Sequence, residues 1–411
     1  MRNSYSLEAL SYLSVLVAMV LLPLKTTISN FGIIILIVVS VFSLIVNGGY
    51  WYKLKKKEFY LSTSLTFFIP ILIGYVYATN FEKGLSEAIK NVFYLLVPIV
   101  ILRKDLKYKE LLFWSSKGLI YGSVVSMVLL LSINLYNFYI SELPISKLLS
   151  YNYTSLSFVS PLKDMHPFYL GTYYLFMLIL LWQPIIKIKK GFKVAITTLT
   201  IICLVFINSR NIFFIGMLLL TISLFKSVKP LKSLVILGSI IGVFLLVKPV
   251  LKDTYLYNKL SKGTLWELTD NVATNNTDSK KLSDSRMARW KVALELIRER
   301  PILGYGTSSE KQILEKRYTE KGMRISANQR FDAHNQYLSY SLQYGFVGLF
   351  FIFIFFISNL RRSLFKKHFL LFTFVLILSC ACLTENYLTR NMGINFVALF
   401  ITILYFKPNL R

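Results

Sequence analysis

The chain has 411 residues, of which 55% are hydrophobic and 16% charged. This composition excludes an ordinary soluble domain and predicts an integral membrane protein. The formal net charge of +27 comes from short basic patches between apolar stretches, whereas a nucleic-acid-binding protein gathers its Lys and Arg on a soluble domain. We therefore expect membrane lipids and an anionic partner, and no nucleic acid.

The apolar stretches predict an all-α polytopic bundle. A bilayer core about 30 Å thick is crossed by roughly 20 apolar residues. We expect a retained first helix rather than a signal peptide, because no small-residue cleavage signature follows it. Twelve transmembrane helices are predicted near residues 7–24, 30–48, 59–79, 88–102, 113–136, 167–186, 193–208, 211–226, 231–250, 337–359, 368–384 and 391–406.

The connections between these stretches predict the orientation in the membrane. Lys and Arg are enriched in short cytoplasmic loops, and here they occur in alternate connections. Both termini are therefore expected in the cytoplasm, and the large loop at residues 251–336 on the outer, non-cytoplasmic side. This loop separates nine helices in residues 1–250 from three in residues 337–411. The basic connections lie near residues 53–57, 103–109, 187–193, 226–232 and 361–367.

The large loop holds sixteen Lys and Arg against eleven Asp and Glu, which suggests an anionic ligand on the outer side. Residues 263–281 are polar and predict a linker. Apolar residues at helical spacing then predict a helix that is capped by Ser283 or Asp284 and ends at Pro301. A second short helix is expected from Ser308 to about Lys321.

His334 is one of three histidines and ends the loop, in the sequence DAHNQYL. A histidine titrates near neutral pH and can take a proton from a sugar hydroxyl. Asp332 or Asn335 is placed to orient its ring. The simpler alternative is a histidine at the membrane edge that only bonds to the backbone.

Two arginines in the loop, Arg286 and Arg289, lie three residues apart near a helix start. Their guanidinium groups and the helix N-terminus can converge on phosphate oxygens. A solvated basic helix face explains the pair equally simply.

Arg210 lies in a tight turn between two predicted spans, and charge at membrane depth is usually functional or paired. A snorkelling side chain is the alternative. Lys90 has similar geometry at the start of the fourth span. His166 precedes Pro167 and could bind substrate, but a helix cap is favoured there. Glu385 and Arg390 are expected to form a local ion pair or cap.

No metal or cofactor is expected. The sequence has no exposed carboxylate pair for a divalent ion, no phosphate-binding glycine-rich motif and no His/Asp/Glu cluster at metal spacing. The three cysteines, Cys203, Cys380 and Cys382, lie in apolar stretches and predict neither a disulfide framework nor a zinc site. Arginine side chains can stabilise a departing diphosphate without a metal.

The sequence resembles the O-antigen ligase and O-antigen polymerase superfamily of bacterial glycosyltransferases. The matching features are the Ser209-Arg210 turn, the run SxR…W..A…I…P..G.G between Asp284 and Gly306, and HNQYL at His334–Leu338 with the later Tyr344-Gly345 and Gly348. They cover about residues 205–350.

The resemblance implies a GT-C-type fold in the bacterial inner membrane and a periplasmic active site. Such enzymes transfer a glycan from undecaprenyl diphosphate without a metal. His334 would correspond to the histidine that activates the acceptor hydroxyl, and Arg210 and Arg286 to arginines that hold the diphosphate. Arg289 and Lys90 are further candidates without a family counterpart.

The acceptor is not encoded in these motifs. We favour a ligase that acts on lipid A–core oligosaccharide, because the outer mass lies in one large loop. A repeat-unit polymerase and a protein O-oligosaccharyltransferase are the alternatives within the superfamily. A transporter with twelve spans is the alternative from another class, but its halves should be related, and here they are not.

Overall fold

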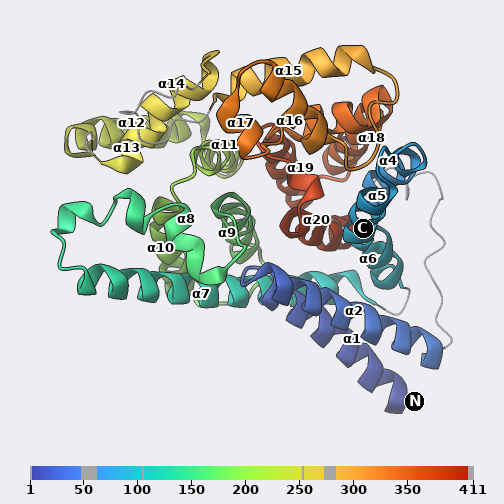
Figure 1. Ribbon diagram of the computed structural model, residues 1–411. Helices are drawn as coiled ribbons and strands as arrows, with labels where there is room; N and C mark the ends of the chain where they lie inside the picture. The colour runs from blue at the N-terminus through green and yellow to red at the C-terminus, as the bar shows by residue number, and fades with distance from the viewer. Residues whose placement is uncertain (1, 48–62, 104–105, 252–253, 273–283, 406–411) are drawn as a thin grey trace. The chain divides into compact units, whose positions relative to one another are not determined.

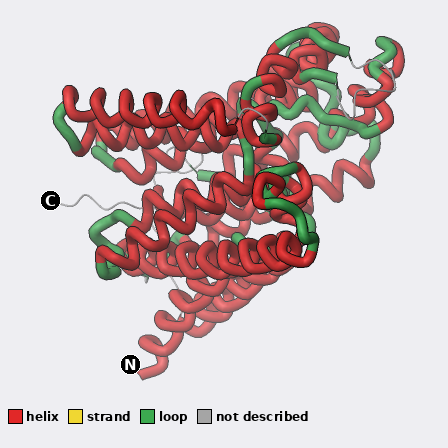
Figure 2. Tube along the Cα trace, turned by 90° about the vertical axis from the view of Figure 1, so that its left-hand side faces the viewer, coloured by secondary structure: helices red, strands yellow, loops and turns green. Residues whose placement is uncertain are grey.

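The computed structural model describes residues 2–47, 63–103, 106–251, 254–272 and 284–405. Within these ranges the regular elements are α-helices and short 3₁₀ helices, without a strand (Figure 2). The all-helical fold class predicted from the sequence is therefore confirmed. The basic patch at residues 53–57 lies outside the described residues.

The chain divides into two compact units. The first comprises residues 1–22, 26–119 and 266–411, and the second residues 23–25 and 120–265. The first unit contains the beginning of the long helix α7 (Tyr108–Ile140) and most of the later half of the chain (Figure 1). Its other elements are α1 (Arg2–Leu21), α2 (Thr26–Asn47), α4 (Leu65–Val76), α5 (Phe81–Lys90), α6 (Phe93–Ile101), α15 (Arg286–Glu299), α16 (Glu310–Glu320), α17 (Arg324–Asn328), α18 (Gln336–Phe365), α19 (Phe369–Cys382), η4 (Tyr387–Thr389) and α20 (Asn391–Tyr405).

The second unit contains the rest of α7 and the middle of the chain. The boundary with the first unit falls inside α14 (Lys262–Leu268). The remaining elements are η1 (Ile145–Lys147), η2 (Tyr151–Tyr153), α8 (Leu156–Val159), η3 (Ser160–Leu162), α9 (Pro167–Leu181), α10 (Lys190–Ile207), α11 (Arg210–Ser227), α12 (Pro230–Leu251) and α13 (Tyr255–Leu260).

Six described stretches are long and apolar enough to cross a membrane, and further helices of 10–17 residues are apolar. Each of the predicted spans contains one apolar helix, although the number of crossings stays a prediction. On α2 the side chains of Phe31, Val38 and Ile45 are 60%, 60% and 75% exposed. Large exposed apolar side chains along a helix are the expected lipid-facing surface. The chain is a multi-pass membrane protein.

The polar helices of the predicted outer loop differ in detail from expectation. The helix α15 begins one residue after Ser285, whose hydroxyl accepts from the backbone N–H of Ala288. The predicted cap at Ser283 or Asp284 is therefore wrong; Asp284 instead accepts from the backbone N–H and hydroxyl of Ser326. The second predicted helix is confirmed as α16, whereas residues 263–268, expected in a linker, lie in α14.

The segment between α15 and α16 docks on a bend in α18. The backbone N–H groups of Tyr305 and Gly306 donate to the carbonyls of Leu342 and Gln343, at 2.9 and 2.8 Å, respectively. In return, the N–H of Phe346 donates to the carbonyl of Pro301 at 2.7 Å. These bonds satisfy backbone groups that the bend removes from the helical pattern.

Gly345 makes the bend possible. Its φ of 58° and ψ of −147° lie in a region that essentially only glycine occupies. A Cβ atom at this position would also overlap the backbone of Pro301 and Ile302.

We expect Gly345→Ala to destabilise the protein by at least about 2 kcal/mol, because it adds both backbone strain and overlap. The melting temperature of the detergent-solubilised protein measures this. Gly191→Ala is the control, since a Cβ there meets nothing within 4 Å. Equal melting temperatures for the two variants would contradict the role of Gly345.

Candidate active site

His334 lies between α17 and α18 in a constrained loop. Its φ is 46°, and its backbone N–H donates to Asp332 Oδ1 at 3.1 Å. The next residue, Asn335, caps α18 by accepting from the N–H groups of Tyr337 and Leu338. A rigid helix start thus fixes the backbone directly beside His334. The prediction that Asp332 or Asn335 orients the imidazole ring stays a prediction.

Glu385 joins His334 to Arg286. Its Oε2 atom lies 3.1 Å from His334 Nδ1, and its Oε1 atom accepts from Arg286 Nη2 at 3.3 Å. The three side chains are 11%, 24% and 18% exposed, respectively. An imidazole that donates from Nδ1 to a carboxylate presents Nε2 as a proton acceptor. In the described part of the chain, Nε2 has no hydrogen-bond partner.

Arg286 retains binding capacity although it touches Glu385. Its backbone N–H donates to Glu267 Oε2 at 2.8 Å at the start of α15. Its Nε atom is buried without a hydrogen-bond partner. A buried guanidinium N–H without an acceptor is costly, so an anion that reaches this side of Arg286 would gain a donor. One helix turn later, Trp290 Nε1 donates to the carbonyl of Ala333 at 2.8 Å and ties α15 to the His334 loop.

Asp332 links His334 to Arg390. Its Oδ2 atom accepts from Arg390 Nη2 at 2.7 Å, and its Oδ1 atom lies 3.6 Å from His334 Nδ1. Burial by itself would raise the pKa of Asp332, but His334 and Arg390 hold that pKa below its usual value. Asp332 is thus a buried anion beside the candidate base.

Glu310 is a second buried carboxyl group beneath the same loop. It accepts from the backbone N–H of Ala333 at 3.1 Å, from Asn386 Nδ2 at 3.1 Å and from the Ser339 hydroxyl at 2.5 Å. Burial raises the pKa of Glu310 to about 7, and the nearby charge of Asp332 acts in the same direction. Glu310 therefore joins the start of α18 to the α19–α20 connection and changes charge near neutral pH.

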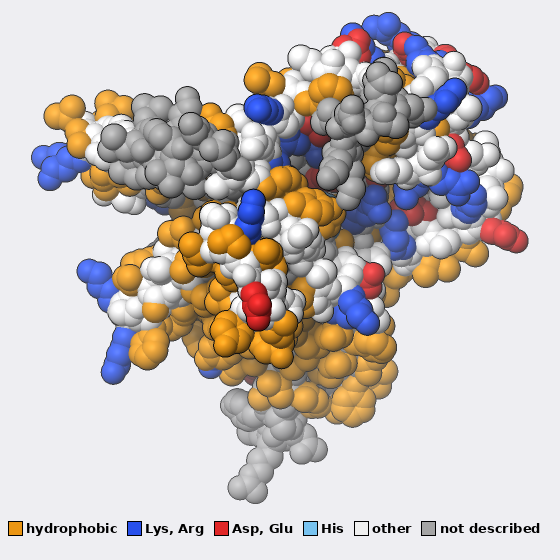
Figure 3. All heavy atoms as spheres, turned by 60° about the vertical axis from the view of Figure 1, so that its left-hand side comes forward, with side chains coloured by type: hydrophobic (Ala, Val, Ile, Leu, Met, Phe, Trp, Pro, Cys, Tyr) orange, Lys and Arg blue, Asp and Glu red, His pale blue; other side chains and the backbone are white. Residues whose placement is uncertain are grey.

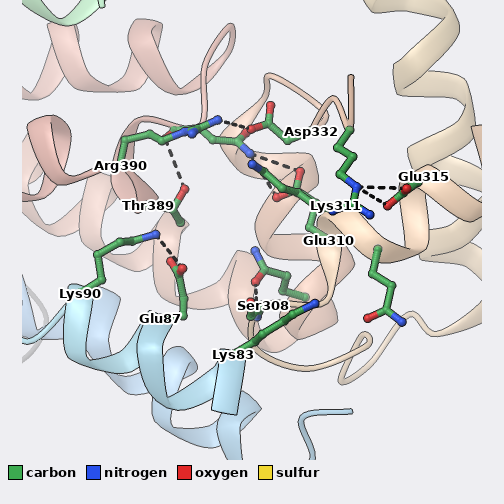
Figure 4. A pocket seen from close by; sticks show the side chains of 14 residues that line it. Lys83, Glu87, Lys90, Ser308, Glu310, Lys311, Glu315, Asp332, Thr389 and Arg390 are labelled. Carbon is green, nitrogen blue, oxygen red and sulfur yellow. Dashed lines mark hydrogen bonds and ion pairs between the residues drawn. The ribbon is translucent and has the colours of Figure 1, made fainter. Parts of the chain in front are cut away.

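Two cavities adjoin the His334 loop. A polar cavity of about 490 Å³ includes Asp332 in its wall (Figure 4). A more open cavity of about 460 Å³ includes Asn335 and is otherwise mainly apolar, with Trp290, Leu294 and Phe353 in its wall. In Figure 3, charged side chains gather at the upper right of the visible face, and hydrophobic side chains cover much of the remainder.

Two other predicted residues of the first unit occupy different surroundings. Arg289 is 3% exposed, lies 5.0 Å from the ring centre of Phe331 and is 3.9 Å from Glu267. This position favours a structural role over contact with a ligand. Lys90 pairs with Glu87 at 2.6 Å and lines the polar cavity.

Arg210 and His166 belong to the second unit. Arg210 begins α11 two residues after Asn208, whose φ is 45°, with Ser209 between them, so the predicted tight turn is confirmed. Burial lowers the pKa of Lys259 to about 8, and the positive charge of Arg210 acts in the same direction. Lys259 donates to the Ser155 hydroxyl at 2.8 Å. His166 caps α9 by accepting from the N–H of Phe168, as favoured from the sequence.

Sequence reasoning missed three residues of the site region in the first unit. Glu385 and Arg390 were assigned to a local pair, but they bond instead to His334, Arg286 and Asp332. Glu310 carried no signal, because its burial depends on tertiary packing, and the same holds for Lys259 within the second unit. The closely spaced charges of LTENYLTR between two apolar stretches were the available clue for Glu385.

These features define a multi-pass membrane protein with a His–Glu–Arg cluster suited to proton transfer and anion binding. A family model described as O-antigen ligase matches residues 195–353. The resemblance predicted from the motifs is thereby confirmed for this segment of the chain. Comparison with curated proteins gives no match. The matched segment contains Arg210, Arg286 and His334 but ends before Glu385.

We expect Glu310→Gln to flatten the dependence of stability on pH. The pKa of Glu310 is about 7 in the fold and 4.5 ordinarily, so the unfolded chain loses this proton at lower pH. The contribution of protonated Glu310 to the stability of the fold is complete below about pH 4.5 and is lost as the pH rises to about 7. Melting temperatures of the wild type and the variant across this interval measure the effect.

Glu315→Gln is the matched control on the same helix, because Glu315 is only half-buried and pairs with Arg330. Identical pH slopes for the wild type and Glu310→Gln would contradict the assignment.

Proposed function

We propose that the chain is an O-antigen ligase. It transfers a glycan from undecaprenyl diphosphate to lipid A–core oligosaccharide on the periplasmic face of the bacterial inner membrane. The observation that carries this proposal is the shared Glu385 carboxylate, which contacts both His334 and Arg286. The family match at residues 195–353 supports the same substrate class.

His334 is the proposed general base. Its Nε2 atom takes the proton of an acceptor hydroxyl as the oxygen attacks the anomeric carbon of the donor glycan. The bond between that carbon and the diphosphate oxygen breaks, and the lipid diphosphate leaves with the electron pair. The carboxylates of Glu385 and Asp332 stabilise the protonated imidazole that results.

Arg286 is the proposed partner of the leaving group. Its unsatisfied Nε–H and the N-terminus of α15 offer donors to phosphate oxygens, where negative charge develops. In the second unit, Arg210 and Lys259 are two neighbouring cations. We assign to these two side chains a contact with the donor diphosphate. Two partly desolvated cations in one place favour binding of an anion.

The apolar cavity supports a lipid-linked donor. It borders Asn335, the residue after His334, whereas the polar cavity borders Asp332, two residues before His334. A substrate with a hydrocarbon tail and a sugar head needs both environments. The transporter alternative gives no role to the His334–Glu385 contact.

Gene deletion followed by complementation tests the proposal. Deletion of a ligase gene removes polymer from lipid A–core and leaves long chains on the lipid carrier. A single repeat left on the core would instead identify a polymerase. An unglycosylated protein with intact lipopolysaccharide would identify a protein O-oligosaccharyltransferase. Unchanged surface glycans would contradict a role in transfer.

In the complemented strain we expect His334→Ala to reduce transfer by about 10²- to 10⁴-fold, the usual contribution of a general base. Glu385→Gln keeps the side-chain shape but removes the charge, and we expect a loss of at least about tenfold. Glu295→Gln, an exposed carboxylate outside the site, should retain activity. Full transfer by His334→Ala at normal membrane abundance would refute the base assignment.

We expect Arg210→Lys to reduce transfer by at least about tenfold, close to the effect of Arg210→Ala. Lysine keeps the charge but loses the planar donor pair that fits phosphate oxygens. The same complementation assay, normalised to membrane abundance, measures this. Arg298→Lys on the exposed face of α15 is the matched control. A fully active Arg210→Lys protein would exclude bidentate binding.

A further inference from the structure

The polar cavity of the first unit is assembled from parts of the chain far apart in sequence. Lys83 and Lys90 come from α5, Lys311 from α16, and Arg390 from the connection before α20 (Figure 4). Its volume of about 490 Å³ falls within the range of sites for small molecules.

The charges in its wall do not cancel locally. Lys90, Arg330 and Arg390 each pair with a carboxylate. Lys83 and Lys311 form no ion pair with any described residue, and they face the cavity from two different helices.

The remaining carboxyl group in the wall, Glu310, does not neutralise the two lysines. It is buried and already accepts three hydrogen bonds from the protein. The cavity therefore offers two cations for an anionic group.

The cavity also suits a sugar. Its wall contains side-chain hydroxyl and amide groups from Ser308, Gln343, Asn386 and Thr389. Such groups donate to and accept from sugar hydroxyls. The carboxylates that pair with the cations add further acceptors. The combination of neutral polar groups with two unpaired lysines favours a sugar that carries a negative charge.

Asp332 connects this cavity to the candidate base. One of its oxygens accepts from Arg390, which is in the cavity wall, and the other accepts from the His334 backbone N–H. Asp332 thus lies between a sugar bound in this cavity and His334, the proposed base.

We propose that this cavity is the acceptor subsite and that it binds an acceptor sugar carrying a phosphate or carboxylate group. Lys83 and Lys311 contact the anionic group, and the neutral side chains contact the ring hydroxyls. The assignment of the cavity as the acceptor subsite rests on the proposed transfer function. Binding of a charged sugar in the cavity does not depend on that function.

Equilibrium binding to the full-length protein in detergent micelles tests the site. The probes are D-glucose 6-phosphate, D-glucuronic acid, D-glucose and inorganic phosphate, each titrated at low salt by saturation-transfer NMR. We expect at least one charged sugar to bind about tenfold more tightly than glucose, the effect of roughly one charge-assisted contact. Added salt should reduce this advantage.

The double variant Lys83→Gln/Lys311→Gln should lose the preference for charged sugars. The matched control Lys291→Gln/Lys316→Gln changes two exposed lysines outside the cavity wall and should keep it. Melting temperatures verify that both proteins fold. No preference in the wild type, or an unchanged preference in the cavity variant, would overturn the proposal. Phosphate that binds as tightly as glucose 6-phosphate would overturn recognition of the sugar.

Two further results separate this inference from the transfer proposal. His334→Ala should abolish transfer and leave binding of glucose 6-phosphate unchanged, because His334 does not line the cavity. In transfer assays, glucose 6-phosphate should raise the apparent KM for the acceptor and not for the donor. The opposite pattern would assign the cavity to the donor glycan and overturn the acceptor subsite.

Discussion

The backbone hydrogen bonds between residues 301–306 and the bend of α18 determine the arrangement of the first unit's polar site. They join the C-terminal end of α15 to α18. Arg286 lies at the start of α15, and α18 begins beside His334. The residue that follows the 301–306 segment, Thr307, contacts α4: its backbone N–H donates to the carbonyl of Gly74 and its hydroxyl to the carbonyl of Ile71. Main-chain groups make most of these contacts, so the arrangement depends on backbone conformation, and glycine is required where a side chain would collide.

The helices could largely be predicted from the sequence, because hydrophobic periodicity and length report directly on burial in a membrane or a core. The boundaries were less predictable where tertiary contacts compete for a capping residue. Asp284 is a good cap by type, yet its carboxylate bonds to Ser326, and Ser285 caps α15 instead. Nothing local in the Pro301–Gly306 segment indicated that it docks on α18.

The candidate site was predictable in its reactive residues and less so in their partners. His334 stood out because the chain has only three histidines, and Arg286 because it shares a loop with His334. The structure places both on one carboxylate. That carboxylate, Glu385, is 51 positions beyond His334, and the packing of α18 against α19 brings it there. Arg210 lies in the second unit, so its predicted role depends on the sequence and on Lys259 beside it.

The position of Glu385 has a consequence for the exchange of the polar loop at residues 251–336 among relatives. The loop that carries Arg286 and His334 ends at residue 336, whereas its carboxylate partner and Arg390 lie in a short connection between the last two helices. A chimera that transplants residues 251–336 alone would retain the host's own residues at that connection. A functional chimera therefore needs both segments, the loop and the connection at residues 384–390, from the same parent protein.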